Sequence, residues 1–455
     1  MKHIVKRLLL LLIIAVSTEA AFAQSNRWRD MHKVKKKETL YSICRDYDIT
    51  LEELKKANPE MTSPDYVLKK GTIIFIPFAA APSDTPVVNL NQNGMPVTTA
   101  DDVKSRVIRL GILLPLHNND GDGKRMVEYY RGILMACDSL KKEGISIEVF
   151  AWNLPLDGSV QTVLADPQAA KCDLMIGPLY SKYVKELSDF TDQHKILLVI
   201  PFSIEAPELY TNRYMFQVYQ HPNELNESTS RRFADWFSDC HPIIVDAGDE
   251  TSNKGLFTAA VRQHLDTRKK NYSLTHINTT DDYFVKCFKT DQRNVVLLNT
   301  ARFSDMNALF GKLSTVAISN PSIQIEVFGY TEWLTQASRQ LENFYRYNVY
   351  VPSHFFTNVN SPATISMSQK YRHHFRQEMM QLYPRFALTG FDHAYFFLKG
   401  LHKYGKTFDG AAGRFGYLAV QTPLKFERIG NGGLQNRAFM FVHYKPDHQV
   451  ELLNY

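Results

Sequence analysis

The sequence has little that would support catalysis or covalent cross-linking. It contains five cysteines among 455 residues, and their odd number and irregular spacing argue against a complete disulfide framework. The motifs G-x-S-x-G, H-E-x-x-H and G-x-x-x-x-G-K-S/T are absent, so serine-hydrolase, zinc-protease and P-loop chemistry have no support. We therefore expect a binding protein with no catalytic residues and no cofactor.

Three short segments approach ligand-binding motifs without completing them. The segment 118–123 begins like an EF-hand calcium loop, but its twelfth position is Tyr129 where a bidentate Glu is needed. Gly430–Gly433 precedes an expected strand, so the helix N-terminus that would bind phosphate is missing. His373 and His374 have no ligand partners at suitable spacing. We expect a polar turn, a loop and a solvated helix face, and no metal site.

The N-terminus has the pattern of a cleaved secretory signal over residues 1–23. Three basic residues precede an apolar run over 8–16, which is too short to span a bilayer, and Ala21-Phe22-Ala23 supplies an A-x-A cleavage site. No Cys follows that site, so lipid anchoring has no support. No later apolar run approaches about 20 residues. We expect secretion across the inner membrane into the periplasm, which excludes nucleic acid as a partner.

Charge is nearly balanced, with 53 basic and 47 acidic side chains and a net charge of +6. The 44% hydrophobic and 22% charged residues are typical of a globular protein with a substantial core. Much of the basic excess after the signal lies near Lys33, Lys35, Lys36 and Lys37. This cluster could attract an anionic wall or membrane surface, or it could be a solvated flank.

Residues 30–78 have the periodicity of a small β-α-α-β domain. Leu40, Ile43 and Tyr47 fall on one helix face, and Asn58-Pro59 ends a second helix because the residue before proline disfavours helical geometry. The two strands are expected to begin near Val34 and Thr72. The two helices are expected to begin near Thr39 and Thr50. In this order, with Glu38-Thr39-Leu40 and Ile74-Phe75-Ile76-Pro77, the segment resembles a LysM module.

The resemblance implies binding to N-acetylglucosamine-containing glycans such as peptidoglycan. In LysM modules the sugar lies in a shallow groove between the first strand–helix loop and the second helix–strand loop. The residues that the resemblance places along this groove are Lys37, Glu38, Thr39, Leu40, Asn58, Met61, Thr62 and Leu68. The segment 79–105, rich in polar residues and proline, is expected to be a linker that spans about 30 Å as a flexible coil. We expect it to hold the rest of the chain clear of the wall.

From residue 106 onward, expected strands alternate with expected helices, which predicts parallel sheets covered on both faces. This part resembles the type I periplasmic binding proteins, such as the branched-chain amino-acid binding proteins. The fragments that carry the resemblance are Gly111–Pro115, Tyr130–Leu134, Met175–Ser181, Ile200–Leu209 and Thr389–Ala394. The resemblance implies an α/β bilobed fold with two doubly wound sheets. Lobe one would comprise 106–222 and 351–418, and lobe two 223–350 and 419–455.

The resemblance also implies a ligand cleft at the carboxyl ends of the strands. Amino-acid-binding members of the family use small hydroxyl residues after the third and fourth strands, where this chain has Ser181 and Ser203. These serines could contact a ligand or could merely cap helices. The other cleft candidates are Glu205, Tyr219, Asp246, Arg302 and Glu332.

Two functions remain open for the bilobed part. In the first, it binds a small solute (an amino acid, peptide or wall fragment) for transport or sensing, with a permease as partner. In the second, it has lost its ligand and acts as an interaction module on the cell-wall synthesis machinery. Ser181 favours the first, whereas the bulky Phe202 and the charged Glu205 favour the second. Either way, we expect a non-catalytic protein bound to peptidoglycan.

Overall fold

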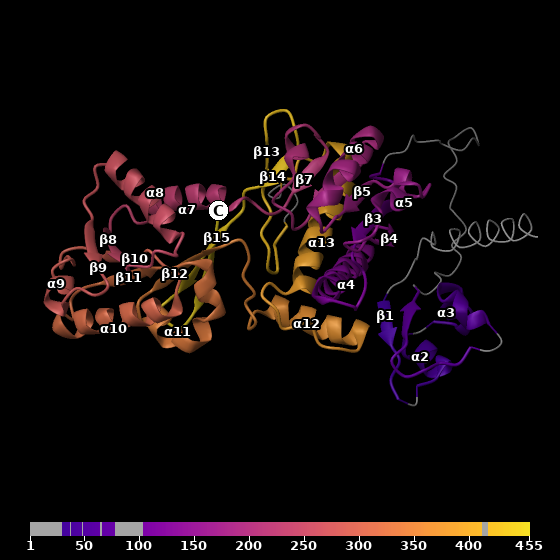
Figure 1. Ribbon diagram of the computed structural model, residues 1–455, viewed down its shortest axis with the longest axis horizontal. Helices are drawn as coiled ribbons and strands as arrows, with labels where there is room; N and C mark the ends of the chain where they lie inside the picture. The colour runs from indigo at the N-terminus through magenta and orange to yellow at the C-terminus, as the bar shows by residue number, and fades with distance from the viewer. Residues whose placement is uncertain (1–29, 37, 48, 64–65, 78–102, 412–416) are drawn as a thin grey trace, which may run out of the picture.

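The computed structural model describes residues 30–36, 38–47, 49–63, 66–77, 103–411 and 417–455 (Figure 1). The molecule is elongated and has two lobes, each built on a seven-stranded sheet. A small module with a two-stranded sheet lies at one end of the molecule, next to the lobe that contains α4 (Gly121–Lys142) and α12 (Pro362–Phe375). The expected signal, Lys37 and most of the expected linker lie outside the described residues. No helix in the described ranges has both the length and the apolar character needed to cross a membrane.

The small module has the expected β-α-α-β order. Strand β1 (Asp30–Lys33) pairs antiparallel with β2 (Ile73–Ile76). Helices α2 (Leu40–Tyr47) and α3 (Leu51–Ala57) lie between them in sequence, followed by a 3-10 turn over Pro59–Thr62.

Both expected caps of the module's helices are present. The Ser42 N–H donates to Thr39 Oγ1 at 3.1 Å, and Thr50 forms a capping box with Glu53. The expected start of the first strand at Val34 is wrong. The strand ends at Lys33, and Val34 is a buried residue of the following loop.

The first lobe is built on a sheet of order β13-β14-β7-β6-β5-β3-β4, parallel except at β13. The strands are β3 (Ile108–Leu114), β4 (Ile147–Asn153), β5 (Leu174–Ile176), β6 (Leu197–Ile200), β7 (Met215–Gln217), β13 (Phe426–Arg428) and β14 (Leu434–Asn436). One face packs against α4 (Gly121–Lys142), α12 (Pro362–Phe375) and α13 (Phe386–Tyr404). The other face packs against α5 (Val160–Leu164) and α6 (Val184–His194).

The second lobe has the sheet order β16-β15-β12-β11-β10-β8-β9. Its strands are β8 (His241–Asp246), β9 (Ser273–His276), β10 (Asn294–Leu298), β11 (Ile325–Phe328), β12 (Val349–Ser353), β15 (Met440–Tyr444) and β16 (Val450–Asn454). Its helices are α7 (Pro222–Trp236), α8 (Lys254–Thr267), α9 (Asp281–Val285), α10 (Phe303–Ser319) and α11 (Ala337–Arg346). Figure 1 shows α7 and α8 on one side of this sheet and α10 and α11 on the other.

The sheets correct two expected lobe boundaries. Strands β13 and β14 belong to the sheet of the first lobe, although the sequence analysis assigned everything after residue 418 to the second. The chain therefore makes its last crossing between Asn436 and Met440. Strand β12 also continues to Ser353 in the second sheet, slightly beyond the boundary expected near 351.

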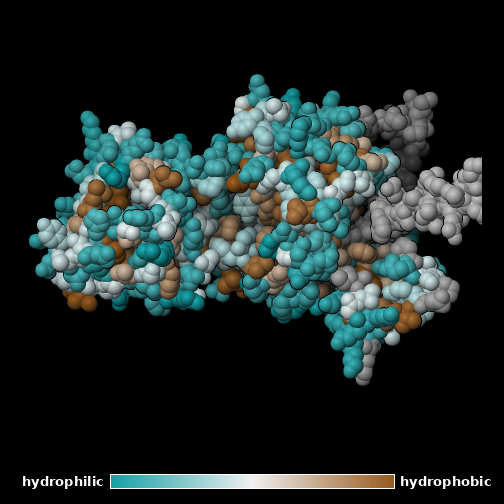
Figure 2. All heavy atoms as spheres, in the orientation of Figure 1, coloured by the Kyte–Doolittle hydropathy of each residue, from teal (hydrophilic) through white to brown (hydrophobic). Residues whose placement is uncertain are grey.

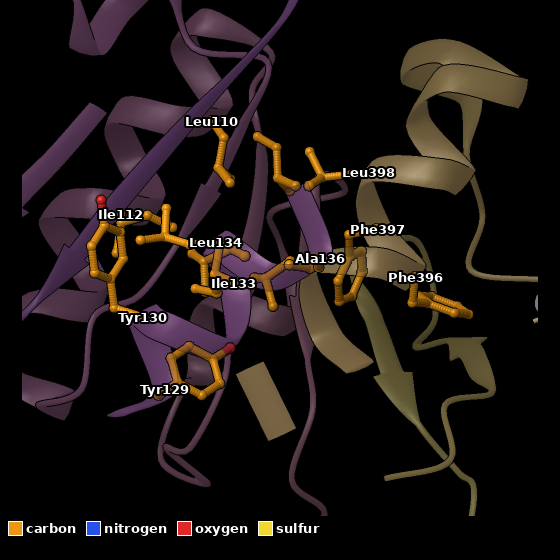
Figure 3. Close-up of a cluster of buried hydrophobic side chains, with 14 of the residues drawn as sticks. Leu110, Ile112, Tyr129, Tyr130, Ile133, Leu134, Ala136, Phe396, Phe397 and Leu398 are labelled. Atoms are coloured by element: carbon orange, nitrogen blue, oxygen red, sulfur yellow. The ribbon is translucent and has the colours of Figure 1, made fainter. Parts of the chain in front are cut away.

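The core of the first lobe depends on a close crossing of α4 and α13 (Figure 3). A Cβ at Gly132 would lie 1.9 Å from the Ala387 carbonyl oxygen, and a Cβ at Gly390 would lie 2.0 Å from the Tyr129 carbonyl oxygen. Only glycine permits this approach. Helix α4 begins at Gly121, earlier than expected, because Asp120 Oδ1 accepts a 2.7 Å hydrogen bond from the Gly123 N–H. The polar turn expected at 118–123 is thus largely the first turn of this helix.

Candidate functional site

The two loops that form the candidate glycan groove are adjacent in the module. The Gly71 N–H donates to the Val34 carbonyl at 2.8 Å, and the Val34 N–H donates to the Thr72 carbonyl at 2.9 Å. These bonds extend the β1–β2 pairing beyond Lys33 and Ile73. The loop after β1 and the loop before β2 are therefore joined at the same end of the two-stranded sheet. A shallow groove between the two loops requires this geometry.

The carboxylate of Glu38 is held inside the module by two hydrogen bonds. Its Oε2 lies 2.7 Å from His32 Nε2 and 2.6 Å from the Lys35 amide nitrogen. Burial opposes ionisation, but the bonds from Lys35 and His32 outweigh it and lower the pKa of Glu38. This side chain shapes the loop after β1 rather than projecting from it.

Two of the predicted glycan contacts lie in the interior. Asn58 is 0% exposed; its Nδ2 donates to the Leu54 and Phe75 carbonyls at 2.8 and 2.7 Å, and its Oδ1 accepts from the Phe75 N–H at 2.7 Å. Met61 is buried in the module core. Both side chains join α3 and its following turn to the core, so a sugar contact from these two positions would have to come from the backbone.

The remaining predicted positions lie nearer the surface. Thr39 and Thr62 are exposed, and Leu40 and Leu68 are half-buried at the edge of the module core. Lys37 lies outside the described residues. These positions offer hydroxyl groups and small apolar surfaces, which are the contacts that acetamido sugars make.

The module also docks onto the first lobe through a buried ion pair, which the sequence analysis missed. Arg131 of α4 places Nη2 2.8 Å and Nε 2.9 Å from Asp30 Oδ1 in β1. The side chains are 10% and 1% exposed. The guanidinium also lies over the Phe375 ring at 5.5 Å and donates to the Tyr371 hydroxyl at 3.2 Å. Arg131 therefore joins β1, α4 and α12.

A second carboxylate lies within this contact. Glu128 accepts hydrogen bonds from the Tyr371 hydroxyl and, at 2.9 Å, from the Met380 N–H. Burial raises the pKa of Glu128, although these bonds and Arg131 oppose the shift.

Apolar contacts accompany the ion pair. Met31 is part of the first-lobe core, and Phe75 of β2 packs against that core. The module therefore packs directly on the first lobe, a contact that the sequence patterns did not predict. The sequence did contain a signal: Arg131 falls on the apolar stripe of α4, at i+4 from Val127.

In the bilobed part, Ser181 and Ser203 are brought together at the carboxyl ends of β5 and β6. Their hydroxyl oxygens are 2.9 Å apart. Ser203 Oγ also accepts from the Glu205 N–H at 3.2 Å, and the Ser181 side chain caps no helix. Glu205 itself is exposed. The serines hold one another and a tight turn, so the simple helix-cap interpretation does not apply to Ser181.

Phe202, which precedes Ser203 in the sequence, packs within a group of aromatic side chains. The Phe202 ring lies 5.1 Å from Tyr129, 5.7 Å from Phe386 and 5.9 Å from Tyr219, measured between centroids. Behind it, the Tyr129 hydroxyl and His393 Nδ1 are 2.8 Å apart. Tyr219, one of the expected cleft residues, therefore packs against a protein side chain, with its ring tilted by 34° to that of Phe202.

The candidate residues of the second lobe each pair with a neighbour in that lobe. Asp246 accepts from the Gly248 N–H at 2.8 Å and from Asn299 Nδ2 at 2.7 Å, and both bonds lower its pKa. Arg302 Nε lies 2.7 Å from Asp305, and Glu332 lies 2.7 Å from Lys254. These contacts satisfy the side chains without a ligand.

A hollow of about 400 Å³ lies elsewhere, at the amino end of β11. Its lining residues are Ser314, Ala317, Ile318, Ile323, Ile325, Arg346 and Tyr347. It therefore lies at the sheet edge opposite the one where the cleft candidates follow their strands. Within the described ranges, no three His, Cys, Asp or Glu side chains gather closely enough to hold a metal ion.

Comparison with known proteins defines the class of each part. Residues 32–77 match the family model for the LysM domain. The bilobed part has the type I periplasmic binding protein fold. A protein assigned as a branched-chain amino acid ABC transporter from Rhodospirillum rubrum aligns with a TM-score of 0.53 and 12% identity, over 76% of this chain and 100% of that one.

Two further solved structures are more distant. LpoA from Haemophilus influenzae has a TM-score of 0.47 and 14% identity over 77% of this chain, which spans 59% of LpoA. An ABC transporter substrate-binding protein from Desulfitobacterium hafniense, in complex with Leu, has a TM-score of 0.40 and 13% identity over 76% of this chain and 100% of that one. No curated protein matches the chain. The chain thus combines a LysM module with a periplasmic-binding-protein fold.

Proposed function

We propose that this chain is an exported, peptidoglycan-associated binding protein without catalytic activity. Its LysM module binds N-acetylglucosamine glycan through the two loops joined by Val34 and Gly71. The bilobed part acts as an interaction module for an envelope protein, such as the machinery that builds the wall. The observation that carries the second half of this proposal is the position of Phe202 between Tyr129 and Tyr219.

An amino-acid ligand needs free hydroxyl groups and an open site. Here the Ser181 and Ser203 hydroxyls bond each other at 2.9 Å, and Phe202, next to Ser203 in the sequence, packs its ring among other aromatic side chains. A ligand would have to break the serine pair and displace an aromatic ring that contacts three others. Both steps cost binding free energy, which favours the interaction module over a solute receptor.

The docked module supports attachment to the wall. Contacts with the first lobe involve Asp30, Met31 and Phe75, at the start of β1 and the end of β2. The loop after β1 and the turn before β2 lie at the other end of this two-stranded sheet, beyond Lys33 and Ile73. Glycan binding and docking therefore use different ends of the module, and a bound wall strand would hold the bilobed part in a defined orientation.

A pull-down of the full chain on purified sacculi tests the wall half. Thr62→Trp places a bulky ring on an exposed position of the second loop and should reduce the bound fraction by about tenfold. Lys56→Trp, on the exposed face of α3, is the matched control and should bind like the wild type. Equal binding by both variants would mean that these loops are not the glycan site.

Thermal unfolding against amino acids, short peptides and muropeptides tests the other half. A ligand that binds only the folded state raises the unfolding midpoint by mass action. We expect no saturable shift with the wild type. A shift that is lost in a Ser181→Ala/Ser203→Ala variant would instead identify a solute receptor.

A further inference from the structure

Five exposed lysines surround the end of the module where the glycan loops meet. Lys33, Lys35 and Lys36 lie at the end of β1 and in the loop after it, and Lys69 and Lys70 lie in the turn before β2. The backbone bonds between Val34 and the turn at Gly71 and Thr72 bring the two groups together. Figure 2 shows hydrophilic residues projecting from the lower end of this module. We call these five residues the lysine cluster.

Within the described part of the module the cluster is only partly neutralised, because Glu38 interacts with the charge of Lys35 and this interaction contributes to the lowered pKa of Glu38. No ion pair there joins any of the five ammonium groups to a carboxylate. Glu38, which follows Lys35 and Lys36 in the sequence, directs its carboxylate to His32 and to the Lys35 amide. Asp30 lies at the opposite end of the two-stranded sheet, where it pairs with Arg131.

Like charges held this close repel one another, and a neutral sugar does nothing to relieve that repulsion. An anion bound beside the sugar does, and carboxylates are the natural partners of clustered ammonium groups. Peptidoglycan differs from a neutral N-acetylglucosamine polymer in carrying short peptides with free carboxylates. Those peptides branch from the same glycan strand that the groove is proposed to hold.

We propose that the lysine cluster binds the carboxylates of these peptides, and that the module therefore prefers peptide-bearing glycan to bare glycan. This inference rests on the proposed function of the module as a wall anchor. It names an acidic peptide, covalently attached to the glycan, as a second recognition element beside the sugar.

The test compares binding of the full chain to three materials: intact sacculi, sacculi whose peptides have been removed by an amidase, and chitin. The variant carries Lys35→Gln, Lys36→Gln, Lys69→Gln and Lys70→Gln. A control with the same charge change carries Lys55→Gln, Lys56→Gln, Lys124→Gln and Lys171→Gln, all outside the cluster.

At low salt, we expect the wild type and the control to bind intact sacculi about tenfold more tightly than the peptide-free material. This factor corresponds to the combined binding free energy of a few surface ion pairs. That preference should disappear in the cluster variant. It should also disappear between about 0.01 and 1 M salt, as the Debye length falls from ~30 to ~3 Å. Chitin binding should be the same in all three proteins.

Several results would overturn the inference while leaving the anchor intact. A cluster variant that keeps the preference, or a wild type that binds both kinds of sacculi equally, shows that the lysines do not read the peptides. Cluster-dependent binding to vesicles of anionic phospholipid, with no preference among wall materials, would assign the cluster to the membrane surface. A wild type that binds none of the three materials would refute the anchor itself.

Discussion

Arg131 and Asp30 form a buried ion pair between parts of the chain that the sequence suggests are separate domains. The two residues are 101 positions apart, and Arg131 Nη2 lies 2.8 Å from Asp30 Oδ1. Because a buried charge is costly without its partner, this contact couples the position of the LysM module to α4 and α12.

Removing Asp30 should release the module. Asp30→Ala leaves the buried Arg131 guanidinium with Glu128, at 3.9 Å, as its remaining carboxylate partner among the described residues, and such losses cost about 3–5 kcal/mol. Hydrogen exchange over α12 should then accelerate, because the docked state is no longer favoured. Asp46→Ala, an exposed acid of the same module, is the control. The double variant Asp30→Leu/Arg131→Met should restore slow exchange, and unchanged exchange in Asp30→Ala would contradict the docking.

The crossing of α4 and α13 should not tolerate a methyl group. Gly132→Ala places Cβ 1.9 Å from the Ala387 carbonyl, so the helices must separate and the first lobe should lose about 1–3 kcal/mol or more of unfolding free energy. Gly311→Ala in α10 meets no atom within 4 Å and should gain up to about 1 kcal/mol from helix propensity. Denaturant unfolding measures both. Equal effects of the two variants would disprove the close crossing.

Asn58 should be needed for folding of the module rather than for sugar contact. Asn58→Ala removes the hydrogen bonds to both backbone groups of Phe75, and each unsatisfied buried group costs about 1–3 kcal/mol. The module should therefore unfold at lower denaturant, and glycan binding should fall only as folding is lost. Glu60→Ala, an exposed neighbour, should leave the transition in place. A folded Asn58→Ala module that fails to bind would instead show direct contact.

Two consecutive buried groups of α13 should make opposite contributions to pH dependence. Burial lowers the pKa of His393 to about 3 and raises the pKa of Asp392 to about 7. His393 is kept neutral, so its contribution to stability is present above about pH 6.5 and is lost as the pH falls towards 3. Asp392 retains its proton in the fold, so its contribution is present below about pH 3.8 and is lost as the pH rises through 7.

Between pH 6.5 and 4 the two slopes therefore oppose each other. In His393→Leu only the Asp392 slope remains, and the unfolding free energy should rise on acidification by up to about 1.4 kcal/mol per pH unit relative to the wild type. Denaturant titrations at several pH values measure this difference. An unchanged pH slope would mean that His393 titrates normally in the folded protein.

Part of this structure followed directly from sequence patterns. The caps at Thr39 and Thr50 and the helix end at Asn58-Pro59 were predicted correctly, because each depends on a few neighbouring residues. The fragments around Gly132 and Gly390 carried the resemblance to the binding-protein fold. Gly132 and Gly390 prove to be the residues that allow α4 and α13 to cross closely.

Other features could not have been predicted in the same way. The sequence placed Asn58 and Met61 on a groove surface, yet each is buried, because loop position alone does not say which way a side chain points. The sequence marked Ser181, Ser203 and Phe202 as notable without saying that the serines bond each other beside an aromatic cluster.

The sequence by itself determined the kinds of element, their order and the two classes of domain, because hydrophobic periodicity and capping are local properties. Tertiary structure decided which distant segments are partners. It paired Asp30 with Arg131, assigned β13 and β14 to the first lobe and packed Phe202 against Tyr129. Periodicity shows that a residue is buried, but the partner that satisfies a buried charge or fills a cleft depends on how the whole chain packs.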